Sequence, residues 1–113
     1  MFQDVYSFEI RKNESERIMI KHKDRIPCIV QKAPHSKLMA HKKIKYLVAS
    51  TSPMSDIIYF LRKSVKLETH QSLFFMINDT LVATSSIMGQ IYQDMKSKDG
   101  FLYIYYSEES TFG

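Results

Sequence analysis

The glycine at the end of this 113-residue sequence is the residue whose type and place most readily suggest chemistry. Gly113 follows Phe112, and a residue without a Cβ adopts backbone angles that are closed to other residues. Such a tail can pass through a narrow enzyme channel and present its carboxylate for activation. Glycine makes up about 7% of protein residues, so roughly one chain in fourteen ends on it by chance. The rest of the sequence must therefore decide whether Gly113 is a reactive end.

The side chains that usually carry catalysis or bind metals are few and scattered. The single cysteine, Cys28, lies in an apolar run with no His or Asp arrangement near it. We therefore expect a buried structural thiol and not a nucleophile. The four histidines show no i, i+4 or Cys/His spacing, so we expect them to be exposed and not to bind metal. They are His22, His35, His41 and His70. The sequence predicts no catalytic residue, no metal site and no cofactor.

The composition is that of a globular domain whose charge is unevenly distributed. Hydrophobic residues make up 44% and charged residues 25%, and no run approaches the roughly 18 apolar residues of a spanning helix. No apolar signal segment opens the chain, so cytoplasm is the expected compartment. Residues 1–63 carry 13 Lys/Arg and 6 Asp/Glu, whereas residues 64–113 carry 3 and 6. A basic half fits an acidic peptide, an anionic membrane or nucleic acid as partner, or simply a solvated surface.

The first 24 residues are polar with scattered apolar positions. Ser7 is a suitable helix cap, and acidic residues precede basic ones, which suits the helix dipole. We expect one or two short helices with a thin apolar seam that docks onto another part of the chain.

Four strands and two further helices are expected downstream. The strands cover 26–30, 45–49, 73–78 and 101–107. Ser52-Pro53 is a good helix start, and Ser85 or Ser86 can cap the second, shorter helix. Pro27 should lie near the start of its strand or at a bulge. Lysines before 45–49 are typical of an edge strand, and Asn78-Asp79 follows 73–78 as a turn.

This order of elements predicts an α+β protein with the ubiquitin-like β-grasp arrangement. We expect a four-stranded mixed sheet and an N-terminal helical extension. A single domain should cover 1–113, with the extension in 1–22, the β-grasp core in 23–107 and a C-terminal tail in 108–113.

The helix after Pro53 carries more apolar surface than a core needs. Its core stripe recurs at i, i+3, i+4, i+7 and i+11, at Met54, Ile57, Ile58, Leu61 and Val65. Phe60 lies about 100° round the helix from Leu61, so Ile57 and Phe60 form an apolar shoulder. The shoulder is either overflow of the core or, beside an edge strand, one wall of a peptide pocket.

Several ordered stretches resemble one known family, the autophagy-related ubiquitin-like modifiers that include GABARAP and microtubule-associated protein light chain 3. The stretches are KDRIPCIVQKAP (23–34), KYLV (45–48), YFLRK (59–63), LFFMIN (73–78), MGQIYQD (88–94) and DGFLYIYYSEESTFG (99–113). They are collinear and include the terminal aromatic-glycine. Departures at Ala49, Ser52, Ser64 and Val82 suggest a divergent member with a reshaped second pocket.

The resemblance implies a modifier that is itself a substrate and not an enzyme. The carboxylate of Gly113 would be activated by an E1-like enzyme and passed by an E2-like enzyme to phosphatidylethanolamine, and a deconjugating cysteine protease would reverse the step. The lipidated protein would lie on the autophagosomal membrane and recruit cargo receptors and adaptors. An unconjugated peptide-binding adaptor of the same fold is the alternative. A nucleic-acid binder would rest on charge and strand tyrosines alone, and we expect no nucleic-acid partner.

The resemblance also implies a binding site for acidic aromatic-x-x-aliphatic peptides, which would add as a strand beside residues 45–49. The aromatic pocket would use Glu14, Ile18, Pro27, Ile29, Lys45, Leu47 and Phe101. The aliphatic pocket would use Tyr46, Val48, Ile57 and Phe60. The acidic flank of the peptide would meet Arg25, Lys43 and Arg62, together with Lys45.

Overall fold

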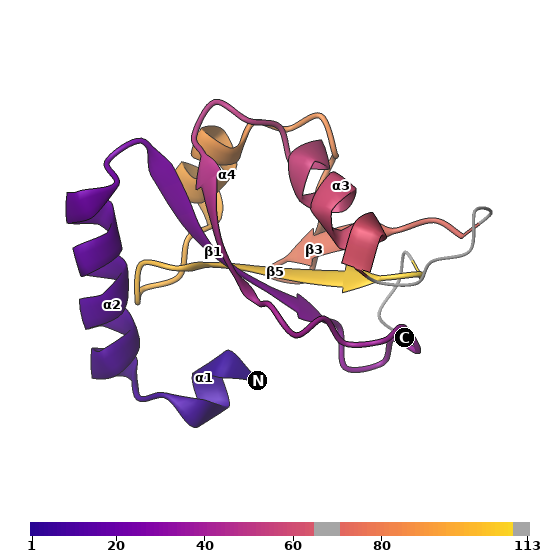
Figure 1. Ribbon diagram of the computed structural model, residues 1–113, viewed down its shortest axis with the longest axis horizontal. Coiled ribbons are helices and arrows are strands. Elements are labelled where there is room, and N and C mark those ends of the chain that lie inside the picture. Colours follow the sequence, from indigo (N-terminus) through magenta and orange to yellow (C-terminus); the bar gives the residue numbers. More distant parts are fainter. Residues whose placement is uncertain (65–70, 110–113) are drawn as a thin grey trace.

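The computed structural model describes residues 1–64 and 71–109 of the chain. In chain order the elements are α1 (Phe2–Val5), α2 (Phe8–Lys21), β1 (Arg25–Lys32), β2 (Lys45–Ala49), α3 (Ser55–Ser64), β3 (Phe74–Ile77), β4 (Thr80–Leu81), α4 (Met88–Met95) and β5 (Leu102–Ser107). Figure 1 shows the strands crossing the middle of the molecule, with α3 and α4 on one side and α1 and α2 on the other.

The sheet is mixed, as predicted, but it has five strands where the sequence predicted four. Its order is β2-β1-β5-β3-β4; β1 and β5 are parallel, and the other neighbours are antiparallel. The extra strand, β4, follows a tight turn at Asn78 and Asp79, which have φ of 52° and 61°. The turn was predicted, but two residues are too few to show the alternation by which a strand is recognised in sequence.

The two central strands divide their side chains between two apolar layers. Cys28 and Val30 of β1 belong to the larger cluster, whereas Ile29 between them belongs to the smaller one. In β5, Leu102 and Ile104 likewise face the larger cluster. This alternation follows from the period of two along a strand, so a strand that is buried throughout can serve two layers.

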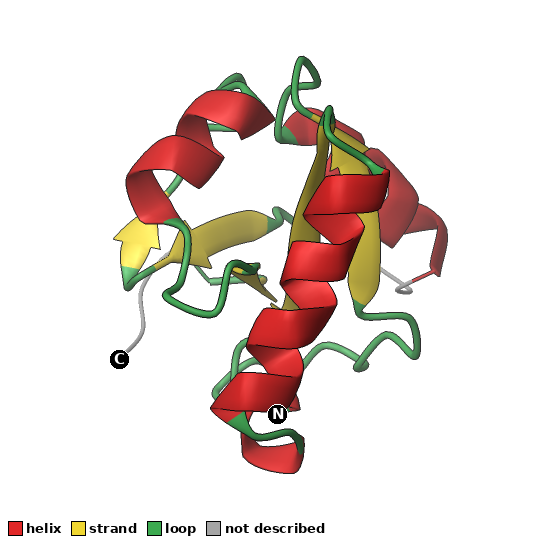
Figure 2. Ribbon diagram, turned by 90° about the vertical axis from the view of Figure 1, so that its left-hand side faces the viewer, coloured by secondary structure: helices red, strands yellow, loops and turns green. Residues whose placement is uncertain are grey.

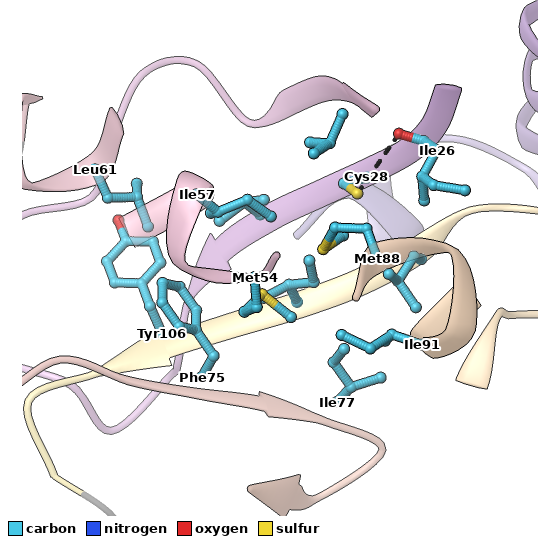
Figure 3. Packing of buried hydrophobic residues seen from close by; sticks show 14 of the residues in the cluster. Ile26, Cys28, Met54, Ile57, Leu61, Phe75, Ile77, Met88, Ile91 and Tyr106 are labelled. Atoms are coloured by element: carbon cyan, nitrogen blue, oxygen red, sulfur yellow. Dashed lines mark hydrogen bonds between the residues drawn. The ribbon is translucent and has the colours of Figure 1, made fainter. Parts of the chain in front are cut away.

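The larger cluster packs α3 and α4 onto the sheet (Figure 3). Met54, Ile57 and Leu61 have no exposed surface, which confirms the predicted stripe as far as it lies within the described residues; Val65 lies outside them. Ile58 is partly buried against the same cluster. The sulfur of Cys28 lies in this layer and donates to the carbonyl of Ile26 at 3.6 Å.

The N-terminal extension consists of two helices docked on the other face of the sheet. Ser7 caps α2, as predicted, because its Oγ accepts from the N–H of Ile10 at 3.3 Å. Figure 2 shows α2 lying in front of the sheet, and its contacts are mainly with β1. Near its middle, the Ser15 hydroxyl donates to the carbonyl of Asp99. Gly100, with φ of 91°, lets the chain pass that close, since a Cβ there would lie 2.3 Å from Ser15 Oγ.

The starts of α3 and α4 were both predicted too early. Residues at the two predicted starts pair with each other and so are not available to begin a helix. Pro53 forms an isolated β-bridge with Ile87, and the N–H of Met54 donates to the carbonyl of Ser86 at 2.9 Å. α3 therefore begins at Ser55 and α4 at Met88, whose N-cap residue Ile87 has no side-chain cap. The predicted Ser52, Ser85 and Ser86 caps are wrong for this reason.

The strand beside which a peptide was predicted to bind lies at the edge of the sheet. β2 has the predicted bounds and is the first strand in the sheet order. Pro27 is the third residue of β1 and precedes the first pair that β1 makes with β5, Cys28 with Leu102. Its missing N–H is therefore tolerated near the strand start, as predicted.

Candidate peptide-binding surface

The outer edge of β2 is a suitable surface for adding another strand. Within residues 1–64 and 71–109, no strand pairs with its outer side. Leu47, in the middle of β2, is 42% exposed, although it lies opposite Pro27 in the register with β1. An edge strand offers unpaired backbone N–H and C=O groups, and here it also offers an apolar side chain.

A first cavity of about 210 Å³ opens between α2 and the β1–β2 pair. Its lining residues are Ile18, Pro27, Cys28, Lys45, Tyr46, Leu47 and Phe101. Five of the residues that the resemblance assigned to the aromatic pocket are among them. Ile29 is not, because it is fully buried in the smaller cluster. Cys28 and Tyr46 line this cavity without having been assigned to it.

Glu14 reaches this cavity through an ion pair. Its Oε1 lies 2.6 Å from the Nζ of Lys45. The same ammonium lies 5.3 Å from the ring centroid of Phe2 and 6.0 Å from that of Tyr6. The pair is partly exposed, with 49% of the Lys45 side chain accessible, so it contributes about 1 kcal/mol or less. Its main effect is to hold the Lys45 stem beside the apolar lining.

A second cavity, of about 350 Å³, lies on the other side of the same strand, next to α3. His41, Lys43, Tyr46, Leu47, Phe60 and Lys63 line it. Tyr46 and Phe60 were assigned to the aliphatic pocket and do line this cavity. Val48 and Ile57 do not, because they are 7% and 0% exposed and belong to the larger core cluster.

Two of the lysines that line the second cavity lie over aromatic rings. The Nζ of Lys43 lies 4.8 Å from the centroid of Tyr46, and that of Lys63 lies 4.3 Å from the centroid of Tyr59. The Tyr46 hydroxyl is 3.4 Å from His41 Nδ1, and burial raises the pKa of the Tyr46 phenol. Sequence reasoning did not assign His41 or Lys63 to a pocket, because no local pattern shows which loop and helix residues face β2.

The three residues proposed for the acidic flank of a peptide lie in different places. Lys43 lines the second cavity and lies two residues before Lys45, which lines the first. Arg25, paired in register with Ala49, lies at the opposite end of β2 from Lys45. Arg62 is exposed on α3 and donates to the carbonyl of Gln71 at 3.4 Å. Neither arginine lines either of these two cavities, so the cations that line them are Lys43, Lys45 and the unassigned Lys63.

The other sequence candidates do not form a reactive centre. Cys28 is 1% exposed, as predicted, and its burial raises the pKa of the thiol well above the usual range. Among the described residues, no group of three His, Cys, Asp or Glu could hold a metal ion. No helix in that part of the chain is long and apolar enough to cross a membrane. Gly113 lies outside the described residues.

Comparison with known proteins identifies the family of this fold and surface. The family model described as "Autophagy protein Atg8 ubiquitin like" matches residues 10–113. The chain is 46% identical over 112 residues to autophagy-related protein 8 of Candida glabrata, covering 99% of this chain and 95% of that protein. It is also 46% identical over 112 residues to the Schizosaccharomyces pombe protein of that name, covering 99% of this chain and 93% of that one.

Solved structures show the same similarity. Trypanosoma brucei ATG8 matches with a TM-score of 0.89 and 37% identity, over 99% of this chain and 97% of that one. Plasmodium falciparum Atg8, solved in complex with a peptide of Plasmodium falciparum Atg3, matches with a TM-score of 0.86 and 27% identity, over 99% and 98% of the two chains. The family model, the curated relatives and the solved structures agree, and the chain belongs to the Atg8 family of ubiquitin-like autophagy proteins.

Proposed function

We propose that this protein is a ubiquitin-like modifier that is conjugated through Gly113 to phosphatidylethanolamine and recruits peptide-bearing partners to the autophagosomal membrane. Family membership and the similarity of the C-terminal stretch, which ends in Phe112-Gly113, support the conjugation. E1-like and E2-like enzymes would form the lipid bond, and a cysteine protease would cleave it. The protein would be the substrate of these steps, moving from the cytoplasm to the membrane when lipidated.

One observation carries the recruiting role: two cavities share Tyr46 and Leu47 on a single edge strand. A peptide paired with β2 would gain main-chain hydrogen bonds and place two side chains in the hollows. In an extended aromatic-x-x-aliphatic segment the first and last residues lie roughly 10 Å apart. Lys43 and Lys45 would meet acidic residues beside the motif. The Plasmodium relative solved with an Atg3 peptide supports peptide binding by this fold.

The recruiting role is tested with two leucines on opposite edges of the sheet. Leu47→Ala removes an apolar group shared by both cavities and should weaken binding of an acidic aromatic-x-x-aliphatic peptide by roughly tenfold or more. Leu81→Ala, on β4, is the matched control, because Leu81 is 52% exposed and lines neither hollow. Calorimetric titration of both variants measures the difference. Equal affinities for wild type and Leu47→Ala would rule out this surface.

The conjugating role is tested separately with Gly113→Ala in a reconstituted lipidation reaction. Added bulk at the last residue should block transfer to phosphatidylethanolamine while leaving peptide affinity unchanged. Lipidation of the variant at the wild-type rate would contradict conjugation through a required glycine.

An unconjugated adaptor is the second candidate, because the two cavities on β2 are lined by residues between Ile18 and Phe101 and could bind a peptide without any conjugation. Such a protein would depend on Leu47 for peptide binding and would show no lipid adduct on Gly113 in cells. Mass spectrometry of the protein from its native source separates the two candidates.

A further inference from the structure

The connection between β1 and β2, residues 33–44, carries a basic and apolar surface that the proposed peptide site uses only in part. It contains no Asp or Glu, and its three lysines are exposed. They are Lys37, Lys42 and Lys43. Leu38 packs against the larger core cluster, whereas Met39, next to it, is 67% exposed. The loop therefore presents one flexible apolar side chain among cations, an arrangement suited to the boundary between headgroups and acyl chains.

The end of β5 holds this loop at its centre. The Tyr106 hydroxyl accepts from the N–H of His41 at 3.1 Å and donates to the carbonyl of Met39 at 3.4 Å. Tyr106 itself is 1% exposed, so the attachment point is rigid. Met39 is thus fixed by its backbone while its side chain remains in solvent.

Glu108, the first residue of the C-terminal tail, is hydrogen-bonded to the same loop. Glu108 Oε2 accepts from the Ser36 hydroxyl at 3.1 Å, and its Oε1 accepts from the N–H of Lys37 at 3.3 Å. Burial alone would raise the pKa of Glu108, but these hydrogen bonds outweigh it and lower the pKa. The Glu108 carboxylate therefore stays ionised while it is hydrogen-bonded to the loop. A second contact comes from Lys32, whose Nζ donates to the carbonyl of Ser36 at 2.9 Å.

We propose that residues 35–43 form a contact surface for an anionic lipid bilayer, with the lysines at the headgroups and Met39 entering the interface. The inference rests on the proposed attachment of a lipid to Gly113. Residues 109–113 can span at most roughly 17 Å, so a lipid on Gly113 would keep this loop close to the membrane. Tethering raises the effective concentration of the surface, and a weak contact then becomes populated.

A lipid surface fits this loop better than the acidic flank of a peptide. Lys37 and Lys42 line neither cavity, and Lys43 alone lines one of them. Opposing charge comes from Glu108, which is engaged by the loop itself, from exposed Glu109, and from Asp4 and Asp79, which line a cavity with His35 at the start of the loop. The three lysines lie within residues 37–43, which contain no carboxylate, so this part of the loop remains cationic.

Chemical anchoring tests the proposal without the conjugating enzymes. A Gly113→Cys variant is coupled to maleimide-bearing lipid in phosphatidylcholine vesicles with or without phosphatidylserine; Cys28, at 1% exposure, is shielded from the reagent. Amide hydrogen exchange is then measured over residues 35–43. We expect exchange to be at least about fivefold slower on the anionic vesicles, the factor that one lysine near such a surface supplies.

Charge and apolar variants in the anchored background define the contact. Lys37→Gln with Lys42→Gln should remove most of the difference between the two vesicle types, leaving only the share of Lys43, and Met39→Ser should reduce it less. Lys12→Gln with Lys98→Gln, which removes the same charge from exposed positions outside the loop, should leave it unchanged. Peptide affinity should be the same in all of these variants.

Two results would overturn the proposal. Equal exchange on neutral and anionic vesicles would show that the loop does not contact lipid. Loss of peptide affinity in the Lys37/Lys42 variant, with no vesicle effect, would assign the loop to peptide binding instead. Because the anchor is chemical, either answer is obtained whether or not Gly113 is conjugated by enzymes.

Discussion

The two faces of the sheet are packed by different means. Under α3 and α4 the buried side chains form a large apolar cluster. Under α1 and α2 a small apolar cluster lies beside a buried polar network, in which Asp99 accepts from Arg11 Nη1 at 2.9 Å and from the Tyr103 hydroxyl. Apolar burial is non-directional, whereas hydrogen bonds require fixed geometry. We therefore expect the face under α3 and α4 to contribute most of the free energy of unfolding. The polar network on the other face determines the position of α2 on the sheet.

This difference matters for the peptide surface because each cavity belongs to a different face. The first cavity needs Ile18 of α2, so its shape depends on the polar network that positions α2. The second needs Phe60 of α3, which is carried by the apolar core. Changes to the network should therefore affect the first cavity before they affect global stability.

The largest effect should come from the apolar face. Leu61→Ala removes a fully buried side chain from α3 and should lower the free energy of unfolding by about 3–4 kcal/mol, through lost burial and the cavity left behind. Urea denaturation measures it. Leu81→Ala, at an exposed position, should change stability by no more than about 0.5 kcal/mol. A similar small loss in Leu61→Ala would mean that this face is not the main source of stability.

The next effect should come from the polar network. Asp99→Ala removes a fully buried carboxylate that also accepts from the N–H of Phe101 at 3.0 Å. Arg11, Tyr103 and the N–H of Phe101 then lose their acceptor. We expect the free energy of unfolding to fall by about 2–3 kcal/mol. In amide hydrogen exchange, the amides of α2 should exchange faster than those of β1.

Asp94→Ala, exposed on α4, is the control for Asp99→Ala and should be nearly neutral. If exchange rose equally throughout the chain in Asp99→Ala, the two faces would form one cooperative unit and the proposed division would not hold.

A smaller effect is expected where α2 meets the start of β5. Gly100→Ala adds a Cβ to a residue with φ of 91°, and this Cβ would lie 2.3 Å from Ser15 Oγ. The free energy of unfolding should fall by about 1–2 kcal/mol. Ser15→Gly in the same chain should restore part of the loss, since it removes the colliding group, and a double-mutant cycle by urea denaturation isolates that coupling. Strict additivity of the two substitutions would indicate that α2 does not press on this turn.

The smallest effect should appear only at high pH. Burial raises the pKa of the Tyr103 phenol above its ordinary 10.0, and the hydrogen bond to Asp99 raises it further. A raised pKa means that the folded protein holds this proton more tightly, so the contribution to stability is complete below pH 10 and falls as the pH rises above it. Stability measured against pH should fall less steeply in this range for Tyr103→Phe than for wild type. Identical slopes would show that Tyr103 does not report on the network.

Much of the fold could be predicted because local patterns determine element types. The apolar stripe predicted α3, the run KYLVA predicted β2 with the correct bounds, and the lysines before β2 predicted its edge position. The helix starts could not be predicted, because the backbone of Met54 hydrogen-bonds to Ser86, a partner distant in sequence. A capping signal describes only what a segment prefers when nothing else competes for it.

The binding surface was predicted in part for a related reason. Resemblance supplied Lys45, Tyr46 and Leu47 of β2, which do line the cavities. It also supplied Ile29, Val48 and Ile57, which the structure buries. It omitted His41 and Lys63, which line the second cavity. The direction of each side chain depends on the register of β1 with its neighbours and on the angle of α3, and neither is encoded in a single segment.

The sequence by itself determined the element types, the edge position of β2, the burial of Cys28 and the family to which the chain belongs. The first three follow from periodicity and residue type within short windows, whereas the family follows from the similarity of collinear stretches. Tertiary structure alone decided which side chains share a cavity and where α3 and α4 begin. It also decided that Asp99 accepts hydrogen bonds both from Tyr103, four residues away, and from Arg11, 88 residues away in the sequence. Such contacts form only when the whole sheet has assembled, because their energy depends on distances that no local segment fixes.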